Sequence, residues 1–154
     1  MPNGLTMGKD GLIYVPSTTG GYIDVFSIDT LSSSQGHTLK ALNTEPHHLH
    51  HLTRLSTLPI DNLRPDADGD IYAAAFPACH KWIESEMDPF GVHPPSAVLR
   101  IRAGEGEGGY VVETVLEDNG SVLPGSTVAV HDAQTGRIFL GGAMAPWISI
   151  CETR

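Results

Sequence analysis

Three segments of the 154-residue chain follow one plan, and this repeat constrains the fold more than any other feature of the sequence. They are NGLTMGKDGLIYV from residue 3, DNLRPDADGDIYA from residue 61 and STVAVHDAQTGRIFL from residue 126. Each begins with small polar residues, continues through a short apolar run, turns at an Asp/Gly element and enters a second run with Ile and an aromatic ring. The turn glycines, Gly11, Gly69 and Gly136, lie roughly 60 residues apart, near the spacing of the four-stranded blades of a β-propeller.

The remaining sequence is typical of an all-β protein. Helical periodicity is nearly absent, and short β-rich runs are bounded by Gly, Asp or Pro. The repeats therefore predict antiparallel four-stranded sheets, about three blades of a six-bladed propeller, with residues 1–154 as one partial β-propeller. Half a ring leaves two open sheet edges, which favour pairing with another chain or with a second copy as a homodimer.

Two segments fall outside the repeat. Residues 32–52, SSSQGHTLKALNTEPHHLHHL, have the composition of a long connection. Residues 81–96, KWIESEMDPFGVHPPS, contain Pro94-Pro95, which stops any regular element. We expect both segments to be long loops within the propeller.

The charge balance narrows the range of partners. A formal net charge of -9 argues against nucleic acid and is compatible with binding a cation. No run of about 20 apolar residues exists, so no membrane span is expected, and the first residues lack the basic and apolar regions of a signal peptide. Cys79 and Cys151 are too few for a disulfide framework, and the sequence leaves open whether they pair with each other.

The polar residues that begin each repeat are candidates for a metal site. In a propeller these positions face the central channel, so Asn3 and the pair Asp61-Asn62 are expected to point at one axial position from neighbouring blades. Carboxylate and amide oxygens suit Ca²⁺, whereas transition metals prefer His or Cys. A purely structural role for the three residues is the alternative. Ser126 and Thr127 take the same place in the third repeat, and we expect one of them either to line the tunnel mouth as a substrate wall or to cap a strand.

The acidic residues downstream of Asn62 have a simpler explanation. Asp66, Asp68 and Asp70 flank Gly69, and Asp is favoured in tight turns because its side chain accepts hydrogen bonds from nearby backbone N–H groups. His131-Asp132, at the corresponding turn of the third repeat, is compatible with a His-Asp dyad, but a surface turn is the better interpretation.

Two further groupings suggest chemistry that the sequence supports only weakly. The run His47-His48-Leu49-His50-His51 carries zinc-binding side chains, but a flexible connector does not fix the geometry that zinc needs. Cys79-His80 pairs a nucleophile with a base, but adjacent strand residues point to opposite faces. Neither is expected to form a site.

Several blocks resemble one known family. NGL at 3–5, LPIDNL at 58–63, AVLRI at 97–101, EDNGSVLPGSTVAV at 117–130 and ISICE at 148–152 are similar, in order and spacing, to the C-terminal half of serum paraoxonase/arylesterase proteins. The resemblance implies a six-bladed, SMP-30/gluconolactonase-like propeller with Ca²⁺ in its central tunnel, and hydrolysis of lactones and aryl esters. In that chemistry Ca²⁺ polarises the ester carbonyl while a base activates water.

Residue by residue, the resemblance carries over only in part. Asn3, Asp61 and Asn62 match calcium ligands of the family, whereas its remaining Glu and Asn ligands and its water-activating His pair have no counterpart here. We therefore expect a truncated C-terminal half with no catalytic residue of its own, and hydrolytic activity of the isolated chain is not expected. A non-catalytic half-propeller that binds a partner or itself, and a truncated gene product, are the alternatives.

The resemblance also implies roles for three scattered residues, the first of which is Trp147, expected to line the substrate pocket. Trp82, by its place in the segment 81–96, is expected to help cover the entrance. Packing against the sheets is the better interpretation of both tryptophans. Cys151 matches a terminal Cys whose partner lies outside this chain, so it is expected to be unpaired. Asn119 begins an N-glycosylation sequon that would be used only in a secreted chain, as many family members are; without a signal peptide the location stays open.

Overall fold

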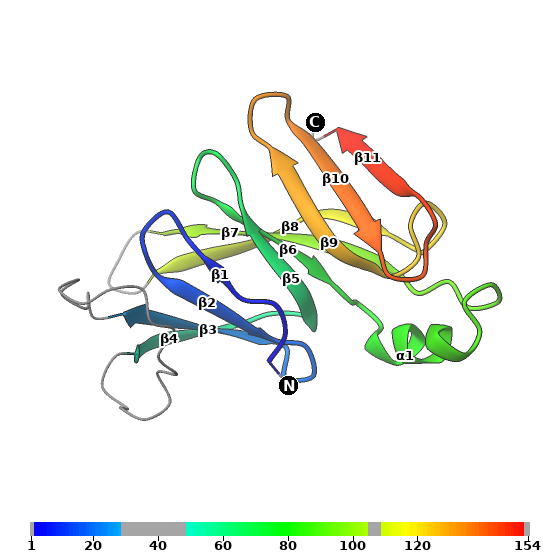
Figure 1. Cartoon of the computed structure of the whole chain (residues 1–154), viewed down its shortest axis with the longest axis horizontal. Coiled ribbons are helices and arrows are strands. Elements are labelled where there is room, and N and C mark those ends of the chain that lie inside the picture. Colours follow the sequence, from blue (N-terminus) through cyan, green and yellow to red (C-terminus); the bar gives the residue numbers. More distant parts are fainter. Residues whose placement is uncertain (1, 29–48, 105–108, 153–154) are drawn as a thin grey trace, which may run out of the picture.

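The computed structural model describes residues 2–28, 49–104 and 109–152, which fold into three antiparallel β-sheets and one helix (Figure 1). The first sheet has strands in the order β1-β2-β3-β4 and the second β5-β6-β7-β8; the third has β9, β10 and β11, with β10 in the middle. The first four strands are β1 (Thr6–Met7), β2 (Ile13–Ser17), β3 (Tyr22–Ile28) and β4 (Leu49–Ser56). The next four are β5 (Ile60–Pro65), β6 (Ile71–Ala75), β7 (Ser96–Ala103) and β8 (Tyr110–Asp118). The last three are β9 (Ser126–Asp132), β10 (Arg137–Gly142) and β11 (Ile148–Glu152).

Each repeat forms the first hairpin of one sheet. The turns β1–β2, β5–β6 and β9–β10 contain Gly11, Gly69 and Gly136, with φ of 78°, 100° and 67°. Only glycine adopts such angles at no steric cost, which explains why the repeat places glycine there. The repeat thus correctly predicted the position of each blade.

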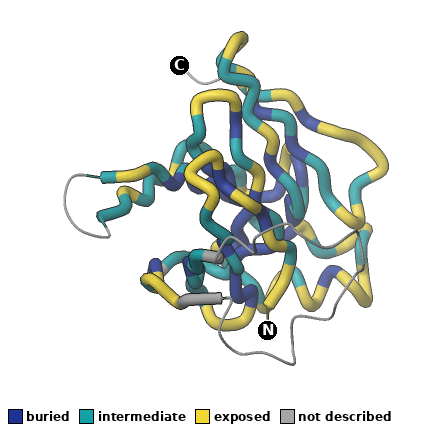
Figure 2. The backbone as a smooth tube through the Cα atoms, turned by 60° about the vertical axis from the view of Figure 1, so that its left-hand side comes forward, coloured by how far each residue is buried: buried dark blue, intermediate teal, exposed yellow. Residues whose placement is uncertain are grey.

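Two apolar clusters hold the sheets together. The first lies between the first and second sheets and the second between the second and third. Strand β6 contributes to both, because Ile71, Ala73 and Ala75 face the first cluster while Tyr72 and Ala74 face the second. A strand buried on both faces reads as a continuous apolar run, as in IYAAA. Figure 2 shows the buried backbone concentrated where the sheets meet.

The first strands of the three sheets lie next to one another. Strand β5 contacts β1 on one side and β9 on the other. Because these strands begin at the same end of the molecule, the polar residues that open each repeat come together there.

The structure of residues 81–96 differs from the predicted long loop. Its first part belongs to helix α1 (Cys79–Met87), which begins after β6 and ends just before Asp88-Pro89. Lys81 to Met87 contain several good helix formers, and Pro89 disfavours helical geometry at Asp88. The Trp82 ring packs against Phe76, with ring centroids 5.1 Å apart. This contact anchors a helix that is too short to be stable alone.

The other expectations about the fold have mixed outcomes. The all-β prediction is confirmed, and two sheets have the expected four strands, but the third has three strands in the described residues. Of the predicted loop 32–52, residues up to 48 lie outside the described part, and the rest belongs to β4. Within the described ranges, no helix is both long enough and apolar enough to cross a membrane.

Candidate functional site

Asn3 and Asp61 meet at the end of the molecule where β1 and β5 begin. The Asn3 side-chain amide donates a hydrogen bond to Asp61 Oδ1 at 2.5 Å and lies 3.2 Å from the Thr18 hydroxyl oxygen. The Thr18 hydroxyl in turn donates to the Ile60 carbonyl at 2.7 Å. The first two blades are therefore joined by side-chain hydrogen bonds at this end.

Asp61 is a buried carboxylate, and few hydrogen bonds compensate for its loss of hydration. Its residue surface is 9% exposed, and its Oδ2 makes no hydrogen bond within the described part of the chain. Burial raises the pKa of the Asp61 carboxyl, and the hydrogen bond from Asn3 opposes this only in part. Such a carboxylate favours either a proton or a cation.

Asn62 connects the second blade to the third. Its side-chain amide donates to the Thr127 backbone carbonyl at 2.8 Å. This bond turns Oδ1 toward Gly4, where an added Cβ would lie 2.3 Å from that oxygen. A glycine is needed at position 4 because any side chain would displace Asn62.

Ser126 and Thr127 occupy the start of β9 but differ in exposure. Ser126 is fully buried, and its hydroxyl lies 3.1 Å from the Val128 carbonyl and 3.2 Å from that of Gly141. Its backbone N–H donates to the Ser96 hydroxyl at 2.7 Å. Thr127 is partly exposed beside Asn62, so it is the better placed of the two to contact a ligand.

Trp147 lies at the same end of the third sheet, just before β11. Its side chain is half exposed, and its indole N–H donates to the Val122 carbonyl at 3.1 Å. It lines an apolar pocket of about 110 Å³ together with Phe90, Pro124 and Met144. The ring of Trp82 instead packs against Phe76 and lies close to Gly125, as expected for a packing role.

A comparison with known protein families identifies the family of this chain. The sequence profile described as Arylesterase matches residues 2–151. This chain belongs to the arylesterase family. Family membership indicates an ester-hydrolase type of function with small-molecule esters as substrates. No curated protein matches the chain.

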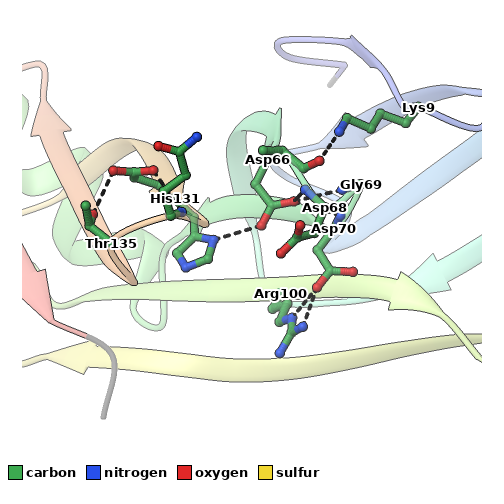
Figure 3. A network of polar contacts seen from close by, with 11 residues as sticks. Lys9, Asp66, Asp68, Gly69, Asp70, Arg100, His131 and Thr135 are labelled. Carbon is green, nitrogen blue, oxygen red and sulfur yellow. Dashed lines mark hydrogen bonds and ion pairs between the residues drawn. The ribbon is translucent and has the colours of Figure 1, made fainter.

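At the opposite end of the molecule, the predicted acidic turn is confirmed. Asp66 Oδ1 accepts hydrogen bonds from the backbone N–H groups of Asp68, Gly69 and Asp70, at 2.9, 2.9 and 3.0 Å (Figure 3). Asp70 does more than form the turn, because its carboxylate accepts a hydrogen bond from Arg100 Nε at 2.6 Å.

The sequence did not predict the partner of His131. Its Nδ1 lies 2.8 Å from Asp66 Oδ2, while the neighbouring Asp132 forms its own turn with Gln134 and Thr135. The His131 side chain is 12% exposed, so the expectation of a surface turn is wrong for this residue. The two partners lie 65 positions apart, and only the packing of two blades brings them together. In the sequence, the contact was signalled only by the alignment of the repeats, in which Asp66 and His131 occupy equivalent positions.

The other candidate residues fall into three groups. Cys79 and Cys151 are both free, and Cys79 begins a helix rather than lying in a strand. Asn119 is exposed in a turn where its side chain accepts a hydrogen bond from the Ser121 N–H. Of the histidine run, His47 and His48 lie outside the described residues, and His51 contacts Asp24 at 3.0 Å. Across residues 2–28, 49–104 and 109–152, no three His, Cys, Asp or Glu side chains form a group that could hold a metal ion.

Proposed function

We propose that this chain forms part of a calcium-dependent hydrolase of aryl esters and lactones, and that Asn3, Asp61 and Asn62 hold the Ca²⁺ ion. The observation that carries the proposal is the convergence of these side chains from two blades on one end of the first strands. Amide and carboxylate oxygens are the ligands that Ca²⁺ takes in proteins.

The surroundings of Asp61 support a cation. A buried carboxylate bonded to one neutral amide is destabilised by the loss of hydration, and its raised pKa has this cause. A divalent ion at the free side of the carboxylate would remove that cost. Asn3 presents its amide nitrogen to Asp61, so ligation by Asn3 requires its carboxamide to turn its oxygen to the ion.

The orientation of the Asn62 side chain also suits a calcium ligand. Its amide nitrogen is engaged by the Thr127 carbonyl, so its oxygen is the free end, and it faces the Gly4 backbone beside Asn3. The ligand count of Ca²⁺ is six to eight, so these three residues would supply only part of the shell. We propose that water, substrate and a further chain or segment complete it.

A bound Ca²⁺ ion would polarise the ester carbonyl and stabilise the oxyanion that develops on it. Thr127 and Trp147 lie at the same end of the third blade, where Thr127 would contact the polar part of the ester and the pocket beside Trp147 its apolar group. The hydroxyl of buried Ser126 would act indirectly, by fixing the start of β9. No residue of this chain matches the family's water-activating His pair, so we propose that this base also comes from outside the chain.

Calcium titration of the purified chain tests the proposal. We expect Ca²⁺, but not Mg²⁺, to raise the melting temperature, and we expect Asn62→Ala to reduce the rise. Asn119→Ala, which removes an exposed side chain of the same type, should leave it unchanged. A melting temperature that does not respond to Ca²⁺ in the unmodified chain would reject the metal site.

Hydrolysis assays separate metal binding from catalysis. With phenyl acetate and γ-butyrolactone as substrates, we expect the isolated chain to bind Ca²⁺ without turnover. Calcium-dependent turnover that is lost in Asn62→Ala would show instead that the chain carries a complete active site.

A second candidate function is self-association, and exposed apolar residues on the outer face of the third sheet support it. In β11, Ser149 is buried and Cys151 packs against the second cluster, whereas Ile148 and Ile150 are 68% and 57% exposed on the other face. On β1, Met7 is likewise 57% exposed. We propose that these faces are covered when two copies pair as a homodimer. A mass from light scattering that stays monomeric at high protein concentration would contradict this.

A further inference from the structure

A groove lies between the second and third sheets, at the hairpin end opposite Asn3 and Asp61. Its volume is about 680 Å³. Its lining residues come from the β5–β6 turn, from β6, β7, β8, β9 and β11, and comprise Asp66, Asp68, Asp70, Tyr72, Arg100, Val115, His131 and Glu152. This groove belongs to neither the proposed calcium site nor the pocket beside Trp147.

His131 offers an oriented hydrogen-bond acceptor to the groove. Burial alone would raise the pKa of Asp66, but the hydrogen bonds from His131 and from three backbone N–H groups outweigh it, so the pKa is lowered and Asp66 is ionised. A carboxylate can only accept, so His131 Nδ1 carries the hydrogen of the 2.8 Å bond. In the neutral ring Nε2 is then an acceptor, and it makes no hydrogen bond within the described residues.

Tyr72 contributes a second polar atom without a partner. Its ring stacks on His131 with centroids 4.3 Å apart, and the residue is 3% exposed. Its hydroxyl makes no hydrogen bond within the part of the chain that the structure describes. Burial raises the pKa of Tyr72, and the charges that act on its hydroxyl belong to Arg100 and the turn aspartates, which line the groove. The hydroxyl is therefore directed at the groove.

The charge of the groove is negative after its internal pairs are counted. Arg100, the lining cation, is bonded to Asp70, with Nε at 2.6 Å (Figure 3). Glu152 lies 3.3 Å from Arg137. Asp66 is fully engaged by its four hydrogen bonds. The Asp68 carboxylate makes no hydrogen bond or ion pair within the described residues, because Lys9, the cation at this turn, donates to the Ala67 carbonyl instead. Asp68 thus offers an unpaired carboxylate beside two unpartnered polar atoms.

We propose that this groove binds a small primary alkylammonium ion. An ammonium group carries one positive charge and three N–H donors, which match the Asp68 carboxylate, His131 Nε2 and the Tyr72 hydroxyl oxygen. An anion is disfavoured because Arg100 is already neutralised by Asp70. A metal ion is disfavoured because no suitable group of three ligands exists in the described residues.

Titration followed by ¹H–¹⁵N NMR tests the site, with the n-butylammonium ion as the probe. We expect saturable shifts of the Tyr72, Arg100 and His131 amides. 1-Butanol, which lacks the charge, and tetramethylammonium, which keeps the single charge but lacks N–H donors, should both bind at least about threefold more weakly. Equal affinity for n-butylammonium and tetramethylammonium, or no saturable shift, would overturn the proposal.

Two variants separate the contributions of charge and hydroxyl. Tyr72→Phe keeps the ring that stacks on His131, and Asp68→Asn changes an exposed side chain, so both should fold. Each is expected to weaken binding about three- to tenfold. Glu86→Gln removes the same charge from exposed α1 and should have no effect, and Asn62→Ala should also keep the affinity. Affinities of Tyr72→Phe and Asp68→Asn equal to that of Glu86→Gln would overturn the site.

Discussion

The Asn3 side-chain amide donates a hydrogen bond to Asp61 Oδ1 at 2.5 Å, although the two residues lie 58 positions apart in the sequence. The bond belongs to no strand ladder, because Asn3 precedes β1 and Asp61 pairs with no residue of β6. It exists only because the first strands of two blades pack side by side. The candidate metal site therefore depends on the packing between blades.

Gly4→Ala tests how closely this region is packed. The substitution places a Cβ 2.3 Å from Asn62 Oδ1, at a backbone φ of 21°. We expect a loss of roughly 1–3 kcal/mol in the free energy of unfolding, measured by urea denaturation. Gly11→Ala is the control, because its Cβ meets no atom within 4 Å at φ of 78° and so adds backbone strain alone. Equal losses in the two variants would argue against the contact with Asn62.

Ser96→Ala tests a buried hydroxyl that joins two segments. The Ser96 hydroxyl donates to the Leu123 carbonyl at 2.8 Å and accepts from the Ser126 N–H at 2.7 Å. Its removal leaves two buried groups unpaired, so we expect a loss of roughly 2–4 kcal/mol in unfolding free energy. Ser121→Ala, in an exposed turn, should cost much less. A loss below about 1 kcal/mol for Ser96→Ala would mean that other groups replace the hydroxyl.

Asp66→Asn tests the pH dependence of the contact between the second and third blades. The lowered pKa of Asp66 means that its carboxylate stabilises the fold above the ordinary carboxyl pKa, and that this contribution is lost as pH falls through the folded-state pKa. We expect the variant to be roughly 2 kcal/mol less stable at neutral pH. The difference should shrink in acid, below about pH 4. Melting curves from neutral to acid pH measure it, and a pH-independent difference would contradict the assignment.

Ala74→Leu tests the space available to β6. Ala74 is fully buried and belongs to the cluster between the second and third sheets. Three added carbons would overpack this interface, and we expect a loss of roughly 1–3 kcal/mol by urea denaturation. Ala67→Leu, at an exposed turn position, should change the stability by less than about 0.5 kcal/mol. A neutral Ala74→Leu variant would indicate a loosely packed interface.

Helix α1 shows why local signals were not enough. The good helix formers from Lys81 to Met87 and the stop at Asp88-Pro89 are visible in the sequence, but a nine-residue helix has little stability of its own. The contact between Trp82 and Phe76 decides the conformation, and it depends on where β6 ends. The prediction of a loop failed because it ignored that packing.

The sequence alone determined the features that depend on neighbouring residues. Glycine at each repeat turn, the Asp66 side chain bonded to the backbone of the next residues, and the alternation of strands all follow from local sterics and hydrogen bonding. The repeat also placed Asn3 and the pair Asp61-Asn62 at the start of their repeats, although their role as metal ligands stays a prediction. Tertiary structure decided which side chains meet across blades, such as Asp66 with His131, and which are buried, such as Ser126. These outcomes depend on the angle and spacing at which separate sheets pack, and no short stretch of sequence encodes that geometry.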